Sequence, residues 1–512
     1  MKKLLRVFAV CVMVMAMLVG CAKDSVKPTD GSKATEPTKV AEPTKVAEPT
    51  EAVKKDPVTI TWYMFGDPQE DMPMVMEAVN KILTPKTNAI LDFQLIPYGS
   101  YEDKMSMMIT AGDDYDLAFT CSWLNNFYGN IGKNALMPLD DLIAEYTPNL
   151  TESVPQWVLD VSKINGKTYA VPNQQIMYDQ VGFAVQKALC EKYNFDPKTV
   201  KSAKDLEPFL EQVKNGEKDL YPVSLDNPPY PLVLGGIEVV ANFGMIKRDD
   251  SGITVIPNYT SDESKANYDY ENEWFTKGYI RSDALTVIDD SADTKADKYA
   301  VVFGMIKPGL DAENTAASYE NGNATEWLSG TYDQPYVGAA SGIATMIGMN
   351  VNSKNPAEAM KVLEAINSDK EIYNLLVFGI EGIHYDLVDG FVQVKADSKY
   401  SMNDSAWALG NQFNALYLAG QTEGLWEETK ALNASAQVSN LRGFTFSPEP
   451  VATEIAGLNA VKDEYEPILR YGTEDREETW NAFVDKMNAA GQEKVIAEMQ
   501  KQIDAWKVAN GK

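Results

Sequence analysis

Residues Val58–Phe65 have the sequence VTITWYMF, and the breaker Gly66-Asp67-Pro68 follows them directly. β-branched and aromatic residues at this density favour a strand. Beyond the breaker, apolar residues recur at helical spacing over Met72–Leu83, which predicts an amphipathic helix. This strand, turn and helix form the first unit of an alternating pattern, and that pattern decides the expected fold class.

The alternation continues along the chain. Strands are expected at Ile90–Tyr98 and Asp116–Thr120, with a helix at Tyr101–Thr110 between them. Such alternation is typical of a mainly parallel sheet with helices on both faces. Ligands of these sheets bind outside the carboxyl ends of the strands. The loops at Gly66–Asp67 and Cys121–Tyr128 are therefore where a ligand site is expected.

A second α/β run follows a strand expected at Lys167–Pro172 and begins at Val181. Its further elements are expected at Ala203–Lys214, Tyr221–Leu225, Ser264–Lys277 and Lys298–Met305. Two such runs predict two lobes. A later helix should begin after Asn355 as its N-cap. The chain should end in a helix, because four apolar residues share one helical face: Val495, Met499, Ile503 and Trp506.

The N-terminus predicts export and lipid attachment. A basic start precedes the apolar run Val7–Leu18, which ends in the box Leu18-Val19-Gly20-Cys21. The run is shorter than the ~20 apolar residues that span a bilayer, so a cleaved signal fits better than a membrane helix. We therefore expect acylation of Cys21 and a location on the outer face of the cytoplasmic membrane.

Residues 22–56 have almost no apolar content and contain the near-repeat Glu-Pro-Thr-Lys-Val-Ala at 36–41 and 42–47. Such a segment cannot bury enough surface to fold, so we expect a disordered tether. The whole chain carries 46 basic and 74 acidic residues. This excess of negative charge repels nucleic acid and anionic lipid, so neither is an expected partner.

Few cysteines remain once the N-terminal signal and Cys21 are set aside. Only Cys121 and Cys190 are left as unmodified thiols, which excludes a framework of several disulfides. Two buried free cysteines is the simpler interpretation, and one isolated bridge is the alternative.

Several strings, taken in order, carry a resemblance to a known family. They are NGKTYAVP at 165–172, SKNPAEAM at 353–360, GIEGIHY at 379–385 and GFTF at 443–446. Together they resemble the extracellular solute-binding lipoproteins of bacterial carbohydrate ABC importers, over nearly all of 57–512. The tail is similar to the C-terminal domain of a LipO-type subgroup. Arg442 stands where an apolar residue is expected, either as a pocket cation or as a surface charge.

The resemblance implies an α/β fold of the type II periplasmic-binding-protein class: two α/β lobes joined by a hinge, with a mainly helical C-terminal extension. We expect lobe 1 to comprise 57–175 and 297–342, and lobe 2 to comprise 176–296 and 343–445. The helical region 446–512 should pack on lobe 2.

The same resemblance implies a function. A non-enzymatic monomer without cofactor would capture an oligosaccharide or sugar derivative between its lobes. It would then deliver this ligand to the permease subunits of an ABC importer. A lipid anchor at Cys21 would hold it near that permease.

A sugar site needs aromatic rings for the apolar C–H faces of the ligand and polar groups for its hydroxyls. Aromatic and polar side chains at strand ends and in loops are therefore the candidate contacts. We predict that the ligand is bound by Tyr63, Phe65, Asp67, Trp123, Asn125, Asn126, Gln175, Tyr178, Asp226, Glu381, His384, Tyr385, Trp407 and Asn411.

Several of these residues have a structural alternative. Trp123 could pack in the core, Asp67 could cap a helix, and Gln175 and Tyr178 could make ordinary hinge hydrogen bonds. His384 is the chain's one histidine, and a hydrogen-bonded structural role is the simpler one. A single histidine also argues against a zinc site, so no metal is expected.

Two other functions stay open at this point. The same fold could bind a peptide or an acidic sugar, although only five arginines follow Arg6 to clamp a carboxylate. A surface glycosidase or lyase would need only a pair of carboxylates. Sequence motifs of serine hydrolases, zinc proteases and phosphate-binding loops are absent. Saturable binding of a ligand that stays intact distinguishes a binder from an enzyme.

Overall fold

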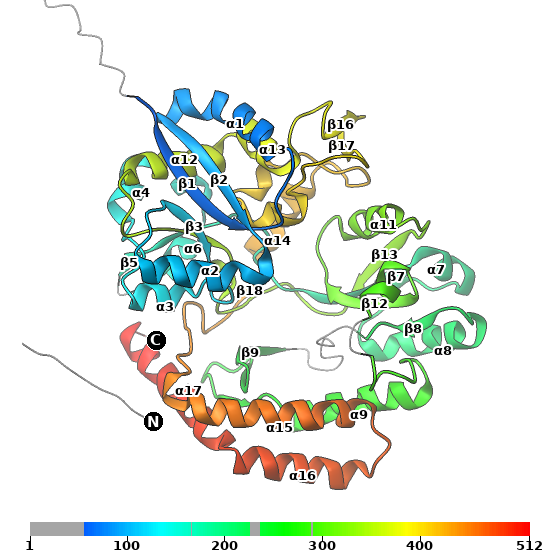
Figure 1. Ribbon diagram of the computed structural model, residues 1–512. Coiled ribbons are helices and arrows are strands. Elements are labelled where there is room, and N and C mark those ends of the chain that lie inside the picture. The colour runs from blue at the N-terminus through cyan, green and yellow to red at the C-terminus, as the bar shows by residue number, and fades with distance from the viewer. Residues whose placement is uncertain (1–55, 165, 226–235, 288–289, 512) are drawn as a thin grey trace, which may run out of the picture. The chain divides into compact units, whose positions relative to one another are not determined.

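The computed structural model describes residues 56–164, 166–225, 236–287 and 290–511 (Figure 1). The expected signal with Cys21, nearly all of the expected tether and the candidate Asp226 lie outside the described residues. None of the helices within these ranges combines the length and the hydropathy of a membrane span.

The first sheet contains the strand that opened the sequence pattern. In the described residues it has five strands, in the order β2 (Ala89–Ile96), β1 (Val58–Phe65), β3 (Leu117–Thr120), β15 (Met346–Met349) and β6 (Ala170–Pro172). β1 is parallel to β2 and β3, whereas β15 is antiparallel to β3 and β6. The sheet is therefore parallel at one side and antiparallel at the other.

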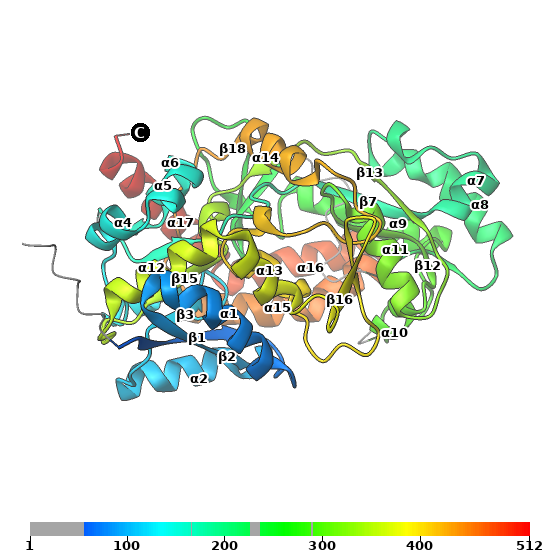
Figure 2. The same ribbon diagram turned by 90° about the horizontal axis from the view of Figure 1, so that it is seen from above.

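Helices cover both faces of this sheet. Figure 2 shows its strands between α2 (Tyr98–Ala111) on one side and α1 (Met72–Thr87) with α12 (Pro356–Ser368) on the other. Ile60, Trp62 and Met64 of β1 are fully buried in the resulting core. Alternate residues of a strand face the same side, so the pattern of Val58–Phe65 builds this core directly.

The second sheet forms the core of the second lobe. In the described residues it has four strands, in the order β13 (Trp327–Thr331), β7 (Val181–Gln186), β12 (Tyr299–Met305) and β8 (Tyr221–Val223). β12 is antiparallel to β7 and parallel to β8. Phe183, Val301 and Trp274 are buried in this core.

The strand pairing corrects the expected division into lobes. The segment 297–342 was expected in lobe 1, but its strands β12 and β13 belong to the second sheet. The segment 343–445 was expected in lobe 2, but its strand β15 belongs to the first sheet. The two segments are therefore exchanged, because the order of elements along a chain does not show which sheet a returning strand joins.

A third hydrophobic cluster joins residues 237–277 to the C-terminal helices. A small sheet of β9 (Ile237–Ala241), β10 (Gly244–Lys247) and β11 (Ile256–Pro257) is followed by α9 (Asp262–Lys277). α15 (Ala452–Tyr471) packs against α9 (Figure 1), and α16 (Arg476–Ala489) and α17 (Gln492–Ala509) complete the group. We call residues 237–277 and 440–509 the C-terminal module.

The hydrophobic centre of the C-terminal module draws on both of its parts. Phe243 and Tyr268 come from the first part, and Phe483, Met499 and Ile503 come from the C-terminal helices. The periodic face predicted for the last helix is therefore confirmed: Val495, Met499 and Ile503 are buried in α17, and Trp506 is partly buried against the same cluster.

Three chain segments connect the lobes and the C-terminal module, and we call 173–180, 332–345 and 436–439 the hinge segments. β14 (Tyr336–Val337) in the second segment is parallel to β18 (Gln437–Val438) in the third. Asp179 and Tyr336 exchange backbone hydrogen bonds of 2.8 and 2.9 Å, which tie the first segment to the second. The hinge segments therefore form one hydrogen-bonded group.

The remaining elements complete the lobes. Pro356 begins α12 as expected, but the side chain of Asn355 makes no capping hydrogen bond, contrary to expectation. The other helices and strands are α3 (Phe127–Gly132), α4 (Asp140–Tyr146), α5 (Pro148–Ser153), α6 (Gln156–Val161), β4 (Lys163–Ile164), β5 (Lys167–Thr168), α7 (Lys187–Tyr193), α8 (Glu207–Gly216), α10 (Ser291–Lys295), α11 (Leu310–Glu320), α13 (Lys370–Phe378), β16 (Tyr385–Val388), β17 (Phe391–Val394) and α14 (Leu425–Ser435).

Candidate functional site

Aromatic side chains gather at the carboxyl edge of the first sheet. Phe65 is the last residue of β1, Phe119 lies in β3, and Trp123 lies in the loop that follows β3. The ring centroid of Trp407 is 5.6 Å from that of Phe65 and 6.0 Å from that of Trp123. Trp407 comes from a short 3-10 helix at Asn403–Ala408. We call Phe65, Tyr98, Phe119, Trp123 and Trp407 the aromatic platform.

The platform is buried beneath and exposed above. Phe65 and Phe119 are buried, whereas Trp123 is 47 % exposed and Tyr98 is 58 % exposed. Tyr98 meets Phe65 edge to face with a centroid distance of 5.8 Å. Half-exposed rings on a buried base form an exposed apolar surface. Such surfaces are typical of ligand-binding sites.

Hydrogen bonds fix the two indole rings of the platform. The Nε1–H of Trp123 donates to the carbonyl of Ala344 at 2.9 Å. The Nε1–H of Trp407 donates to the carbonyl of Asp404 at 2.8 Å. Both ring donors are therefore engaged within the protein. The apolar ring faces are what these two side chains offer to a ligand.

The loop after β3 is shaped by its own amides. Asn125 is buried with a φ of 51°. Its Nδ2 donates to the carbonyl of Phe119 at 2.8 Å, and its Oδ1 accepts from Asn130 at 2.8 Å. Asn126 caps α3, because its side chain accepts from the backbone N–H of Gly129 at 2.9 Å. The side chains of these two predicted ligand contacts hold the loop that carries Trp123.

The two other candidates near the first strand are Tyr63 and Asp67. Tyr63 meets Tyr115 edge to face, with a centroid distance of 5.8 Å. Asp67 is exposed and follows Gly66. Its alternative role as a helix cap is wrong, because α1 begins at Met72.

The string Glu381–Tyr385 stabilises a hairpin. The Nδ1 of His384 accepts from the backbone N–H of Ile380 at 2.8 Å, so the neutral ring donates through Nε2 to Asp71 at 3.3 Å. Tyr385 is buried against Phe378, and Glu381 is exposed. These contacts fit the hydrogen-bonded structural role that was the alternative for His384.

The candidates near the hinge make contacts within the protein. The carbonyl of Gln175 accepts from the Nδ2 of Asn433 at 2.9 Å. Asn411 is buried and donates to the carbonyl of Asn367 at 3.1 Å. The short helix that contains Trp407 ends at Ala408, before Asn411. Tyr178 is 2 % exposed.

The structure therefore brings together Phe65, Trp123 and Trp407 among the predicted contacts. Trp407 belongs to the segment 343–445, which was expected in lobe 2, but its ring lies beside Trp123 and packs against the first-lobe core. Sequence reasoning missed Tyr98 and Phe119. Their position at strand ends was the signal, because Tyr98 follows β2 closely and Phe119 precedes the loop after β3.

Arg442 contacts the first lobe. Its guanidinium carbon lies 5.5 Å from the ring centroid of Trp157 in α6. Burial favours a higher pKa for Asp160, yet Lys163, Gln156 and Arg442 together lower the pKa of that carboxyl. The residue that departs from the family pattern thus packs on a ring and lies near a carboxylate.

Other features of the described residues lie away from the platform. A cavity of about 470 Å³ is lined by Asp113, Asn134 and Asn350, among others. Asp113 precedes β3, Asn134 follows α3 and Asn350 follows β15, so this cavity lies at the opposite edge of the first sheet. Cys121 and Cys190 are both free and buried, as the simpler interpretation held. In the ranges that the structure covers, no group of three His, Cys, Asp or Glu side chains is placed to hold a metal.

Two α/β lobes, a hydrogen-bonded hinge and a helical C-terminal region define the solute-binding fold. Comparison with known proteins agrees. Residues 440–508 match the family model described as "Domain of unknown function (DUF3502)". A "Carbohydrate ABC transporter substrate-binding protein" of Streptococcus pneumoniae is 28 % identical over 462 residues, which are 88 % of this chain and 91 % of that protein.

Solved structures share this fold. The N-glycan transport solute binding protein NgtS of Streptococcus pneumoniae has a TM-score of 0.79 and 25 % identity, over 89 % of this chain and 100 % of that one. Its complex with Man5GlcNAc has a TM-score of 0.65 and 26 % identity, over 89 % and 99 %. The alginate-binding protein AlgQ2, 17 % identical over 88 % and 99 %, has a TM-score of 0.59 and shares the fold alone. The chain is a homologue of carbohydrate ABC transporter substrate-binding proteins, as its sequence strings indicated.

Proposed function

We propose that this protein is the substrate-binding component of an ABC importer and that it binds an oligosaccharide on the aromatic platform. The observation that carries the proposal is the pair of fixed indole rings, Trp123 and Trp407, at the carboxyl edge of the first sheet. A homologue supports a sugar as the ligand, since NgtS has been solved in complex with Man1GlcNAc and with Man5GlcNAc.

The chemistry of the platform suits a sugar ring. A pyranose has an apolar C–H face, and an indole ring of fixed orientation covers that face at little entropic cost. The exposed face of Trp123 and the edge of Tyr98 are both available. The hydroxyls at the rim of the sugar need polar partners, and the side chains of the facing lobe would supply them when the hinge closes.

The wider role follows the family. We infer that the protein works outside the cytoplasmic membrane, tethered through acylated Cys21, as a monomer that presents its ligand to permease subunits. It would release the ligand unchanged, without catalysis. Two acyl chains on Cys21 would give stable membrane attachment, since one chain alone binds only weakly.

Calorimetry on the full chain tests the proposal. The titrants are neutral oligosaccharides including a mannose-rich N-glycan, uronic oligosaccharides and peptides, and each mixture is then checked for products. Saturable binding of an intact neutral oligosaccharide is expected. Binding of peptides or uronic oligosaccharides alone would contradict the neutral sugar, and repeated turnover would contradict the role in import.

A further inference from the structure

The C-terminal module contacts the hinge through a cation. Arg248 follows β10, and its Nη1 lies 3.1 Å from both carboxylate oxygens of Asp333 in the second hinge segment. The two side chains are 14 % and 15 % exposed. The guanidinium carbon of Arg248 also lies 4.1 Å from the ring centroid of Tyr336. One residue of the module therefore contacts two residues of that hinge segment.

An acidic residue of the module makes a second set of contacts. Glu238 of β9 is 7 % exposed. Its Oε2 accepts from the hydroxyls of Tyr336 and Ser439, each at 2.6 Å, and its Oε1 accepts from the backbone N–H of Ala339 at 2.7 Å. Charge-assisted bonds of this kind are roughly twice as strong as neutral ones. A single carboxylate thus joins the second hinge segment to the third.

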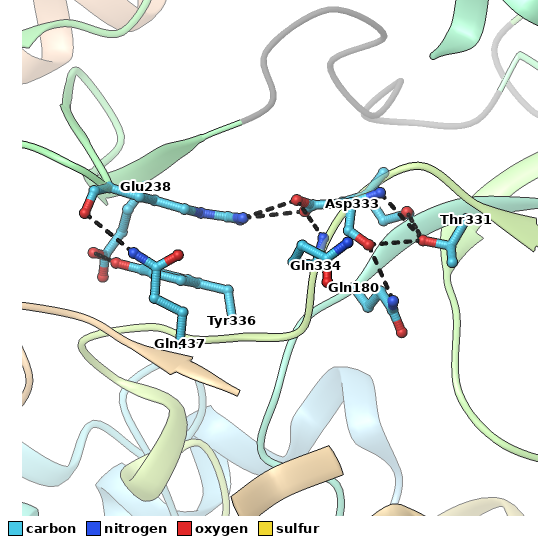
Figure 3. A network of polar contacts seen from close by, with 9 residues as sticks. Gln180, Glu238, Thr331, Asp333, Gln334, Tyr336 and Gln437 are labelled. Atoms are coloured by element: carbon cyan, nitrogen blue, oxygen red, sulfur yellow. Dashed lines mark hydrogen bonds and ion pairs between the residues drawn. The ribbon is translucent and has the colours of Figure 1, made fainter. Parts of the chain in front are cut away.

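The same network reaches the first hinge segment. The carbonyl of Asp333 accepts from the Nε2 of Gln180 at 3.0 Å and from the hydroxyl of Thr331 at 3.2 Å (Figure 3). Gln437 of β18 lies beside Tyr336 in the same view and donates to the carbonyl of Arg248 at 3.4 Å. All three hinge segments are therefore connected to Glu238 or Arg248 within two hydrogen bonds.

The C-terminal module is well suited to hold these two residues in place. Its hydrophobic cluster packs β9 and β10 against the C-terminal helices. It also contacts the first lobe, because the hydroxyl of Thr445 donates to that of Tyr128 in α3. The residues that contact the hinge therefore belong to a module with a hydrophobic cluster of its own.

We propose that the C-terminal module sets the resting conformation of the hinge through Glu238 and Arg248, and so controls how often the lobes are competent to bind ligand. The segment 440–508, which matches a domain of unknown function, would take part through its helices, which share a hydrophobic cluster with the strands that carry or precede these two residues. Only the expected effect on ligand affinity rests on the proposed function. Glu238 and Arg248 act as positioning residues, since they bond the hinge segments and are not part of the aromatic platform.

The physical reason lies in the cost of moving a buried charge. A hinge moves by changing the backbone angles of a few residues, and Asp333, Tyr336, Ala339 and Ser439 are among those available here. Moving them apart from the module would leave Glu238 or Asp333 buried without its partner, which is strongly unfavourable. If a ligand binds only at another hinge angle, its apparent affinity is reduced in proportion to the fraction of molecules that have that angle.

Distance measurement between spin labels tests the proposal without any ligand. The labels are placed at Met107→Cys in the first lobe and Tyr319→Cys in the second, which are 65 % and 51 % exposed. The native Cys121 and Cys190 are 0 % and 5 % exposed and should not react. The variants Glu238→Gln and Arg248→Met are compared with Lys247→Met. Lys247 pairs with Glu263 at the surface of the same module and is the matched control.

We expect Glu238→Gln and Arg248→Met to broaden or shift the distance distribution, and Lys247→Met to leave it unchanged. Oligosaccharide affinity should change by about fivefold in the first two variants, the lower range of typical coupling between sites. An unchanged distribution in both folded variants would overturn the proposal. If the distribution shifts and no oligosaccharide binds, the role of the module stands and the proposed function fails.

Glu238→Gln keeps the size and one acceptor of the native side chain, so it is expected to fold. It keeps the proposal testable if Arg248→Met fails to fold. Thermal unfolding of every variant accompanies the distance measurement. A lower melting temperature with the native distance distribution would show that the network contributes stability alone, and this too would overturn the proposal.

Discussion

The ring centroids of Trp123 and Trp407 lie 6.0 Å apart, with their planes inclined at 44°. Trp123 follows the third strand of the first sheet, whereas Trp407 comes from a segment that returns to that sheet late in the chain. Their meeting depends on the segment after β15, which belongs to the first lobe. The return of the chain from the second lobe to the first completes the aromatic platform.

Trp407→Ala should lower both stability and ligand affinity. The ring of Trp407 packs against Phe65 and Phe119 over the first-lobe core, and removing a large core side chain costs about 3–5 kcal/mol when the ring is fully buried. Trp407 is only partly buried, so about 1–3 kcal/mol is expected. Urea unfolding measures this loss. Trp407→Phe should restore part of it, and equal stability of the Ala variant and the native chain would contradict the packing.

Arg470→Met should destabilise the C-terminal module. The Nη1 of Arg470 lies 2.9 Å from the Oε2 of Glu271, whose side chain is 2 % exposed. Without that cation the carboxylate of Glu271 stays buried and unpaired, which costs about 3–5 kcal/mol. Arg476→Met is the control, because Arg476 pairs with Asp269 at a more exposed site and should cost at most about 1 kcal/mol. Equal losses in urea unfolding would refute this difference.

Asp179→Asn should remove a pH dependence from the hinge. Burial is the largest cause that raises the pKa of Asp179 to about 6; Glu238 and Asp333 add to it, and Arg248 opposes it. A raised folded pKa gives a contribution to stability that is fully present below the unfolded pKa and is lost as the pH rises through about 6.

The melting temperature of the Asp179→Asn variant, compared with the native chain from pH 4 to pH 8, checks this sign. The variant should gain relative to the native chain as the pH rises, since Asn resembles the protonated acid. Asp67→Asn is the control, because it changes an exposed carboxyl outside the hinge segments. A native chain whose relative stability rises through pH 6 would contradict the assignment.

Gly309→Ala should disturb the contact between the second lobe and α14. Gly309 has a φ of +80°, and a Cβ there would lie 2.3 Å from Leu425. Gly322 has a φ of +81° but open space around its Cβ position, so Gly322→Ala separates backbone strain from collision. Strain alone costs about 1 kcal/mol. Thermal unfolding should show a larger loss for Gly309→Ala, and equal losses would mean that Leu425 moves aside freely.

Local pattern predicted much of the fold. The strand over Val58–Phe65 and the helix from Met72 form where alternation and helical spacing place them. These signals depend on neighbours in sequence and on one buried face. The sheet that a late strand joins depends instead on pairing across the whole chain, so β12 and β15 were assigned to the wrong lobes.

The site divides in the same way. The exposed position of Trp123 after β3 was predictable because a strand end and an aromatic loop coincide in the sequence. Asn125 and Asn126 have the same position and a polar side chain, but their amides close the turn and cap α3. Sequence cannot show whether an amide faces a ligand or its own backbone. The hinge network of Glu238 and Arg248 was missed, because it joins the β9–β10 region to three distant hinge segments and leaves no local pattern.

The most direct test is a calorimetric titration of the full chain with the oligosaccharide that it binds best, repeated for Trp123→Ala and Met107→Ala. Trp123 is 47 % exposed and Met107 is 65 % exposed, so neither change should alter folding. Oligosaccharide binding on the aromatic platform predicts that Trp123→Ala weakens affinity by about tenfold or more, roughly 1.4 kcal/mol, while Met107→Ala binds as the native chain does. Native affinity in Trp123→Ala would contradict the platform.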